Sequence, residues 1–499
     1  MVDEPSHPEP ASRSSRPWLA ALLSFVFPGL GQAYRDHRAA AVVFAVPMLI
    51  VVVAAIGILT RVIEPPRNLL LSTGFLVAVL VLNGAIFAWR SAAIVHAGLT
   101  PWTRVSPDRR TSALTVGLLV ILTLAMHAWV GLVVVQLEGT LTRVFAGGDP
   151  GPRQPVSSSR PAASEAPGEA SPPADYRWDG TERINILLLG TDAAPGREAV
   201  LTDVILLVSI DPVDETAVMI SVPRDTGFVP LNDASVYEDR IYPDKINELM
   251  SRAQRSPGRW CPDLEESEEA ACGLRTIQES VGLYVGVEIH HYALVDMAGF
   301  ADLIDALGGL ELCLPGELVD PEFDGSLENE VVTEPLVLPA GCHQYDGLDA
   351  LAYARSRKGW IEMPDGTREP QNDFTRSDRQ QLVLLALRRE LAEADTFLEL
   401  PGVLDAIGRT VTTDFPRDQA GDLASLVPVI TGPDIERLVL SHPEFLDLPL
   451  RPDVNYLLIP KRDAIRDAMA ELFGEDELTG WYLVNPQPQG TDLEPSPPP

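Results

Sequence analysis

Three long apolar runs near the amino terminus constrain this chain more than any other feature. They start near Ala39, at Asn68 and at Ser112. Each contains the ~20 mostly apolar residues that a helix needs to cross the hydrocarbon layer of a bilayer. We therefore expect three transmembrane helices, followed by a folded domain in the carboxy-terminal part of the chain.

A shorter apolar run, WLAALLSFVFPGLGQAY, starts at Trp18 and is interrupted by Pro28, Gly29 and Gly31. It is too short and too broken for a regular span, so we interpret it as a re-entrant or interfacial segment. This interpretation makes the number of membrane crossings odd. If the short run also crossed the membrane and the amino terminus lay inside the cell, the carboxy-terminal domain would lie in the cytoplasm.

Positive charge predicts the orientation of the membrane region. One group of arginines flanks the short run and another lies between the second and third spans: Arg13, Arg16, Arg35, Arg38, Arg104, Arg109 and Arg110. The positive-inside rule places both groups in the cytoplasm. The carboxy-terminal domain is then outside the cell, in a multi-pass protein of the cell membrane.

The cysteines support the same orientation. All four follow the last span, and an even number confined to one domain is typical of disulfides in an oxidising compartment. We expect Cys261 to pair with Cys272 and Cys313 with Cys342, although four cysteines permit three connectivities. Four free thiols are the alternative. A zinc site is less well supported, because the ligand spacing is wrong.

Composition divides the chain into five parts. Proline, serine and alanine dominate a stretch between the last span and the first strand-like run, and similar residues end the chain, as is typical of flexible segments. The predicted parts are a cytoplasmic tail (1–16), a membrane region (17–145), an extracellular linker (146–180), a folded extracellular domain (181–480) and a disordered tail (481–499).

The folded domain is predicted to be α/β, with a mixed central β-sheet flanked by helices. Leucine-rich and β-branched runs at 183–192, 203–211 and 216–225 predict three strands in quick succession. Helical periodicity follows at 244–254, 273–285, 297–309 and 377–394. We interpret the segment from about Phe397 to Phe473 as a helical completion of this domain.

Arginines stand out against a very acidic background. The formal net charge is −33 and the pI is about 4.5, which excludes nucleic acid as a partner. Yet Arg355, Arg357, Arg376 and Arg379 fall within one short segment. A guanidinium fork binds phosphate in a bidentate manner, so the segment predicts a phosphate or pyrophosphate ligand. Surface ion pairs with neighbouring acids are the alternative.

Two aspartates suggest a metal site. Asp192 ends the first predicted strand and Asp203 opens the second, so antiparallel pairing would bring the two carboxylates to one end of the sheet. Mg²⁺ (or Mn²⁺) prefers one or two carboxylates together with water and phosphate oxygens. The alternative is that both residues are turn or capping residues.

These features occur in the order typical of a known family. GTD contains Asp192, TD contains Asp203, and SVPRD and DKIN follow. FADLIDALGGLEL starts at Phe300, and YARSR and DFTRSDRQQ complete the series. From about Arg183 to Phe473 the chain resembles the LytR-CpsA-Psr proteins of bacterial cell envelopes. Any one motif is weak, but seven in register are specific.

The resemblance implies an α/β domain with a hydrophobic pocket for a polyprenyl tail. It also implies a phosphotransferase that moves a glycopolymer from polyprenyl pyrophosphate to peptidoglycan. The partners are then the polyprenyl-pyrophosphate-linked glycan, peptidoglycan and the lipid bilayer. Asp192 and Asp203 would hold magnesium. The pyrophosphate would be lined by Arg224, Arg355, Arg357, Arg376 and Gln380, with support from Asp225, Lys245, Asn247, Asp373 and Arg379.

One position departs from the family pattern. Most relatives carry an arginine two residues before the second aspartate, where this chain has Leu201, and Arg197 is the nearest possible substitute. The departure keeps two other functions open, a protein that binds or senses polyprenyl-linked glycans and a pyrophosphatase. No GxSxG, HExxH or P-loop motif suggests covalent, zinc or nucleotide chemistry. The general base is not evident, and Asp225 and Asp373 are the candidates.

Overall fold

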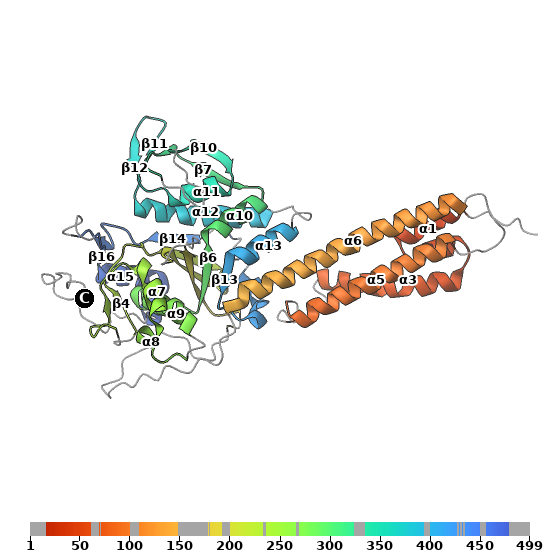
Figure 1. Ribbon diagram of the computed structural model, residues 1–499, viewed down its shortest axis with the longest axis horizontal. Coiled ribbons are helices and arrows are strands. Elements are labelled where there is room, and N and C mark those ends of the chain that lie inside the picture. Colours follow the sequence, from red (N-terminus) through yellow and green to blue (C-terminus); the bar gives the residue numbers. More distant parts are fainter. Residues whose placement is uncertain are drawn as a thin grey trace, which may run out of the picture. The chain divides into compact units, whose positions relative to one another are not determined.

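The protein divides into two units, Met1–Glu138 and Gly139–Pro499. Figure 1 presents the computed structural model. The structure describes residues 16–60, 69, 71–99, 109–147, 178, 180–191, 200–232, 236–265, 269–323, 335–393, 400–426, 429, 432, 435–449 and 456–478.

The described part of the first unit is helical. Its elements are α1 (Pro17–Val26), α2 (Leu30–Tyr34), α3 (Arg38–Leu59), α5 (Thr73–Leu99) and α6 (Arg109–Val144), the last of which continues into the second unit. The helices α3, α5 and α6 are long and apolar enough to cross a membrane. The three apolar runs therefore form three such helices, as predicted.

The short apolar run is broken where the sequence predicts. Gly29 lies between α1 and α2 with φ +102°, a conformation that favours glycine. After the break, the buried Gln32 side chain donates to the main-chain oxygen of Ala93 in α5 at 2.9 Å. Arg90 of α5 donates to Phe25 O near the end of α1 at 2.9 Å. The segment thus folds against α5 as two helices, each too short to span a bilayer.

A six-stranded mixed sheet forms the centre of the second unit. Its strand order is β13-β6-β1-β2-β3-β14. The strands are β1 (Ile184–Thr191), β2 (Thr202–Asp211), β3 (Thr216–Ser221), β6 (His291–Asp296), β13 (Val411–Thr413) and β14 (Ile435–Val439). β1 and β2 pair antiparallel, from Ile184 opposite Ile210 to Thr191 opposite Thr202. The predicted mixed sheet and its first hairpin are confirmed.

The carboxy-terminal segment corrects one prediction. It supplies helices α13 (Leu400–Thr410) and α15 (Arg462–Phe473), but it also supplies β13 and β14, which are the two edge strands of the central sheet. The interpretation of this segment as purely helical is therefore wrong. Strands of three and five residues are too short to give a clear alternating pattern.

Helices cover both faces of the sheet (Figure 1). On one face, α7 (Ile246–Arg255), α9 (Cys272–Val285) and α15 pack against alternate residues of β1, β2 and β3, including Leu187, Leu207 and Ile220. On the other face lies α12 (Asp373–Glu393), whose Gln381 donates to Ser221 Oγ at 2.9 Å and to Leu438 O at 3.0 Å. The first two turns of α12 carry Arg376 and Arg379, two of the four arginines of the predicted segment.

A lobe with its own apolar core extends from the α12 side. Helices α10 (Met297–Ala306) and α11 (Gly347–Arg355) pack there against two small sheets. The strands of these sheets are β7 (Leu310–Leu314), β8 (Glu317–Asp320), β9 (Leu336–Leu338), β10 (Gly341–Tyr345), β11 (Trp360–Glu362) and β12 (Arg368–Pro370), in the orders β10-β7 and β12-β11-β8-β9. The lobe therefore contains the turn between α11 and β11, with Arg355 and Arg357.

The remaining elements of the described part are short. They are α8 (Pro257–Trp260), β4 (Val229–Pro230), β5 (Ile241–Tyr242), β15 (Leu446–Asp447), β16 (Ile459–Pro460) and five 3-10 helices, η1 (Phe145–Gly147), η2 (Glu269–Ala271), η3 (Arg417–Gln419), η4 (Asp422–Leu426) and η5 (Glu475–Glu477). Both predicted disulfides are present: Cys261 is bonded to Cys272, and Cys313 to Cys342 across β7 and β10. Neither free thiols nor a zinc site remains for these four cysteines.

Candidate active site

The site begins with an ion pair at one end of the central sheet. Asp203 is the second residue of β2, and Arg224 follows β3 by three residues, so the β2–β3 pairing brings them together. Arg224 Nη1 lies 2.9 Å from Asp203 Oδ1, and both side chains are less than a quarter exposed. Burial alone raises the pKa of Asp203, but the charges of Arg224 and Arg376 outweigh it. Together with hydrogen bonds from Arg224 and Asn247, they lower the pKa below its ordinary value.

A second carboxylate, Asp373, lies among three guanidinium groups. Its Oδ1 is 3.1 Å from Arg376 Nη2, 3.5 Å from Arg224 Nε and 3.9 Å from Arg357 Nη1. The shared first turn of α12 explains the Arg376 contact. Arg376 also reaches back to the main-chain oxygen of Asp203 at 3.5 Å. Residues from β2, the end of β3 and α12 therefore converge on one cluster.

Several buried atoms in this cluster lack hydrogen bonds. Asp373 Oδ1, Arg224 Nε and Arg376 Nε are buried and have no hydrogen-bond partner within the described part of the chain. Burial lowers the pKa of Arg376, although nearby carboxylates oppose that effect. Unsatisfied buried donors are costly and rare in folded proteins, and a bound anion would satisfy these.

The turn after α11 supplies two further predicted residues. Arg357 is 40% exposed at the side chain and reaches the cluster only through its long contact with Asp373. Arg355 has no ion pair or hydrogen bond with any residue that the structure describes, and it is partly exposed. Gln380, on α12, donates to Ala354 O at 3.3 Å in the same region. The two arginines therefore retain unused donors.

Three predicted supporting residues form a neighbouring group. Lys245 Nζ lies 2.7 Å from Asp225 Oδ1. The main-chain N–H of the buried Asn247 donates a hydrogen bond to Arg224 O at 3.3 Å. Lys245 Nζ also lies 6.0 Å from the ring centroid of Tyr456. These contacts fix the segment that carries Arg224 and Asp225.

Arg379, predicted as a supporting residue, makes no ion pair with the cluster within the described part of the chain and contacts the backbone behind it instead. It is only 3% exposed, and it donates to Tyr353 O at 2.8 Å and also to Gln371 Oε1 and Ser356 O. Burial lowers the pKa of Arg379 to about 10. Arg379 follows Arg376 by three residues, which turns it about 60° round the helix, toward the backbone at the end of α11. It contacts the backbone before and after Arg355.

Of the two carboxylates in the predicted metal site, Asp203 is among the residues that the structure describes. Asp192 and Arg197 lie outside the described residues, and no group of three or more metal-binding side chains occurs within the described ranges. Asp203 supplies a carboxylate, and Asn247 Oδ1 is a buried oxygen without a hydrogen-bond partner among the described residues. Carboxylate and carboxamide oxygens are hard ligands, so the donor chemistry fits Mg²⁺.

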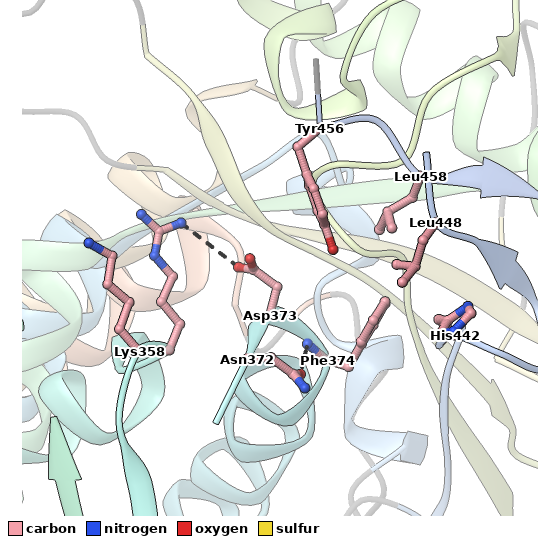
Figure 2. Close-up of a pocket in the computed structure, with 9 residues that line it drawn as sticks. Lys358, Asn372, Asp373, Phe374, His442, Leu448, Tyr456 and Leu458 are labelled. Carbon is pink, nitrogen blue, oxygen red and sulfur yellow. Dashed lines mark hydrogen bonds and ion pairs between the residues drawn. The ribbon is translucent and has the colours of Figure 1, made fainter. Parts of the chain in front are cut away.

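A cavity of about 450 Å³ lies beside this cluster. It is lined by Arg357, Lys358, Asn372, Asp373, Phe374, His442, Leu448, Tyr456 and Leu458. Figure 2 shows Lys358 and Asp373 on one side of it, Leu448 and His442 on the other, and the ring of Tyr456 reaching in between. The cavity therefore joins a charged wall to an apolar one.

The apolar wall of the cavity was not predicted from the sequence. His442, Leu448, Tyr456 and Leu458 come from the loops around β15 and β16, where no motif or periodicity distinguishes them. The His442 ring is fixed by a contact of 2.9 Å between its Nδ1 and Leu446 O. Because a carbonyl oxygen only accepts, Nδ1 carries the proton in this contact.

Comparisons with known proteins agree with the motif series. The profile of the LytR_cpsA_psr family matches residues 155–447. The polyisoprenyl-teichoic acid–peptidoglycan teichoic acid transferase TagU of Halalkalibacterium halodurans is 27% identical over 307 residues, covering 60% of this chain and 82% of that protein. TagV of Bacillus subtilis, a transferase of the same description, is 26% identical over 280 residues, covering 56% of this chain and 60% of TagV. The crystal structure of B. subtilis TagV aligns with 24% identity and a TM-score of 0.40, covering 58% of this chain and 97% of that one.

Proposed function

The chain belongs to the LytR-CpsA-Psr family, whose profile covers more than half of its length, and we propose that it is a membrane-anchored phosphotransferase. Its reaction moves a glycopolymer from a polyprenyl-pyrophosphate carrier to peptidoglycan during cell-wall assembly. TagU and TagV, which carry the corresponding activity in their names, support this proposal.

The observation that carries the proposal is the cluster of arginines with unused donors beside a half-apolar cavity. Arg224 and Arg376 each have a buried Nε–H group without a hydrogen-bond partner among the described residues, and Arg357 lines the cavity. A polyprenyl-pyrophosphate donor combines a polyanion with a hydrocarbon chain. Guanidinium groups bind the first, and Phe374, Leu448 and Leu458 offer apolar contacts to the second.

The chemistry is a phosphoryl transfer. A hydroxyl group of peptidoglycan attacks the phosphorus that carries the glycan, and a new oxygen–phosphorus bond forms. The bond from that phosphorus to the bridging oxygen breaks, and polyprenyl phosphate leaves with the electron pair. Fixed guanidinium groups stabilise the charge that grows on the phosphoryl and leaving oxygens, so no covalent enzyme intermediate is needed.

The hydroxyl proton must pass to a base. Asp225 and Asp373 remain the two candidates. Each candidate is already ion-paired, Asp225 with Lys245 at 2.7 Å and Asp373 with Arg376 at 3.1 Å, but only Asp373 is among the residues that line the cavity. Asp373 is therefore the better placed of the two, because a base must reach the proton it accepts.

A divalent cation is part of the proposal. Asp203, with Asn247 Oδ1 nearby and with Asp192 as predicted from the resemblance, would hold Mg²⁺ or Mn²⁺. When bound, the ion would neutralise charge on the pyrophosphate oxygens. Arg224 contacts the same Asp203 carboxylate, so it holds the carboxylate in position in either case.

We also propose the topology predicted from charge. The amino-terminal tail (1–16) is cytoplasmic, the membrane region (17–145) crosses the membrane three times, and a linker (146–180) leads to an extracellular domain (181–480) and a terminal tail (481–499). The three apolar helices support a membrane anchor. The two disulfides of the second unit support an oxidising location for that unit.

Product analysis tests the proposal against its alternatives. Full-length protein in lipid nanodiscs is given a short-chain polyprenyl-pyrophosphate glycan with and without peptidoglycan fragments, and released polyprenyl phosphate is measured. A transferase releases it only when the acceptor is present. A pyrophosphatase releases polyprenyl phosphate at the same rate with and without peptidoglycan fragments. A sensor binds the polyprenyl-pyrophosphate glycan but releases no polyprenyl phosphate.

A further inference from the structure

The turn that carries Arg355 and Arg357 is held from one side by a single buried carboxylate. Asp320, the last residue of β8, is 1% exposed. Its Oδ2 accepts from Ser356 Oγ at 2.8 Å, from the Arg357 N–H at 3.1 Å and from the Lys358 N–H at 3.2 Å. Three consecutive residues of the turn thus donate to one oxygen atom.

Arg379 holds the same turn from the other side. This guanidinium, also buried, donates to Tyr353 O before the turn and to Ser356 O within it. The turn therefore lies between two buried, oppositely charged side chains. Charged hydrogen bonds to the backbone are roughly twice as strong as neutral ones, so these contacts define the backbone path.

The backbone on either side is packed closely as well. Gly359 follows the turn, and a Cβ atom there would lie 1.8 Å from Val319 O in β8. β8 and β11 then pair antiparallel, with Trp360 opposite Val319. Lys358 adds an ion pair of 3.2 Å with Glu322, just beyond β8. The strand that ends in Asp320 is thus fixed against the arginine turn.

By contrast, the two arginines have few contacts of their own. Arg355 has no ion pair or hydrogen bond within the described part of the chain, and the contact of Arg357 with Asp373 is 3.9 Å long. Their guanidinium groups can therefore be placed only through the backbone that carries them. Binding sites depend on such supporting contacts, and an error of about 1 Å can cost about 100-fold in rate.

We propose that Asp320 is a positioning residue, which sets the donor affinity of the site by fixing the turn that presents Arg355 and Arg357. The proposal rests on the function proposed above, since it takes the pyrophosphate of the donor as the ligand of the two arginines. Asp320 is buried behind the turn and acts only through these arginines.

Three substitutions in the full-length protein test this role. Asp320→Asn keeps the shape but removes the charge and places an amide N–H group near backbone donors. Ser356→Ala removes one hydrogen bond and leaves the carboxylate. Asp414→Asn is the matched control, because Asp414 is 3% exposed and accepts from the Tyr292 N–H at 2.8 Å, near the start of β6 rather than at the arginine turn.

The readouts are the Kd for a short-chain polyprenyl-pyrophosphate donor, the KM values for donor and acceptor, kcat and the thermal midpoint. For Asp320→Asn we expect the donor Kd and KM to rise about 10- to 100-fold, with the acceptor KM unchanged. For Ser356→Ala we expect a rise of about fivefold, the loss typical of one hydrogen bond. Asp414→Asn should lower the thermal midpoint but keep the donor Kd within about twofold of the wild type.

A folded Asp320→Asn protein whose donor Kd matches that of Asp414→Asn would overturn the proposal. If Asp320→Asn does not fold, an unchanged donor Kd in Ser356→Ala would overturn it instead. The Kd comparison stays decisive if the wild type binds the donor but does not transfer the glycan. That result would count against the transferase function and not against the role of Asp320.

Discussion

Arg376 Nη2 and Asp373 Oδ1 lie 3.1 Å apart on the first turn of α12, yet Asp373 Oδ1 and Arg376 Nε have no hydrogen-bond partner among the described residues. Such atoms are costly when buried. The carboxylate therefore lies at the centre of the arginine cluster but does not accept hydrogen bonds from all of its N–H donors. A phosphate group, with more acceptor oxygens, would satisfy donors that a single carboxylate leaves free.

This relationship makes Arg376 a sensitive position. Replacing it by lysine keeps the charge but removes the planar fork, so we expect Arg376→Lys to lower kcat/KM for glycan transfer by about 100-fold or more. Arg437→Lys is the control, because Arg437 pairs with Asp378 at 3.2 Å outside the cluster. Steady-state assays of both variants check this, and equal effects in the two would contradict it.

The lowered pKa of Asp203 predicts a pH dependence of stability. A carboxyl group whose folded-state pKa lies below the ordinary value of 3.8 contributes stability above that value. The contribution is lost as the pH falls through the folded-state pKa. The difference in unfolding free energy between wild type and Asp203→Asn should therefore be larger at pH 6 than near pH 3. Denaturant titrations at both values measure it, and a difference that does not shrink in acid would refute the expectation.

The family resemblance predicts an arginine at position 201, but this chain has Leu201, which immediately precedes β2. We expect Leu201→Arg to leave transfer activity intact or to raise it, because a further guanidinium would face a polyanionic ligand. Leu201→Met is a control that retains the size and apolar character of leucine. A large loss of activity in Leu201→Arg alone would mean that this connection has been rebuilt for another purpose.

The Cys313–Cys342 disulfide closes a loop with a sequence separation of 29 residues in the lobe that carries the arginine turn. Loop-closure entropy predicts that its removal destabilises the folded state by about 3 to 4 kcal/mol. Paired serine substitution, followed by chemical unfolding, measures this. Removal of the Cys261–Cys272 bond, with a separation of 11, should cost somewhat less, and the opposite order would contradict the loop-length argument.

Local patterns predicted much of this fold. The β1–β2 hairpin follows from two apolar runs separated by turn residues, and α12 follows from its helical period. The edge strands β13 and β14 were not predicted from local patterns. They form because pairing with β6 and β3 stabilises segments that have no clear pattern of their own. Their place in the sheet is set by contacts with strands that are distant in sequence.

In the candidate site too, some residues were predicted from the sequence and others were not. Arg224, Arg376 and Asp203 were predicted from motifs, and the structure brings them together. Tyr456 and Asp320 were not predicted, because a lone tyrosine and a lone aspartate carry no signal until the chain folds around them. Arg379 lies in the same motif as Arg376, but the rotation of the helix directs it to the backbone instead. Spacing within a motif thus identifies candidates, and packing decides which of them join the arginine cluster.

We propose that the protein transfers a glycan rather than only binding one. To test for transfer, full-length protein is incubated with a short-chain polyprenyl-pyrophosphate glycan, peptidoglycan fragments and magnesium, and the products are followed by mass spectrometry. Arg355→Ala is the matched variant, because Arg355 has no ion pair or hydrogen bond within the described residues whose loss would disturb the fold. We predict a glycan-phosphate-peptidoglycan adduct that disappears in Arg355→Ala. Tight binding of the donor by the wild type without any adduct would contradict the claim.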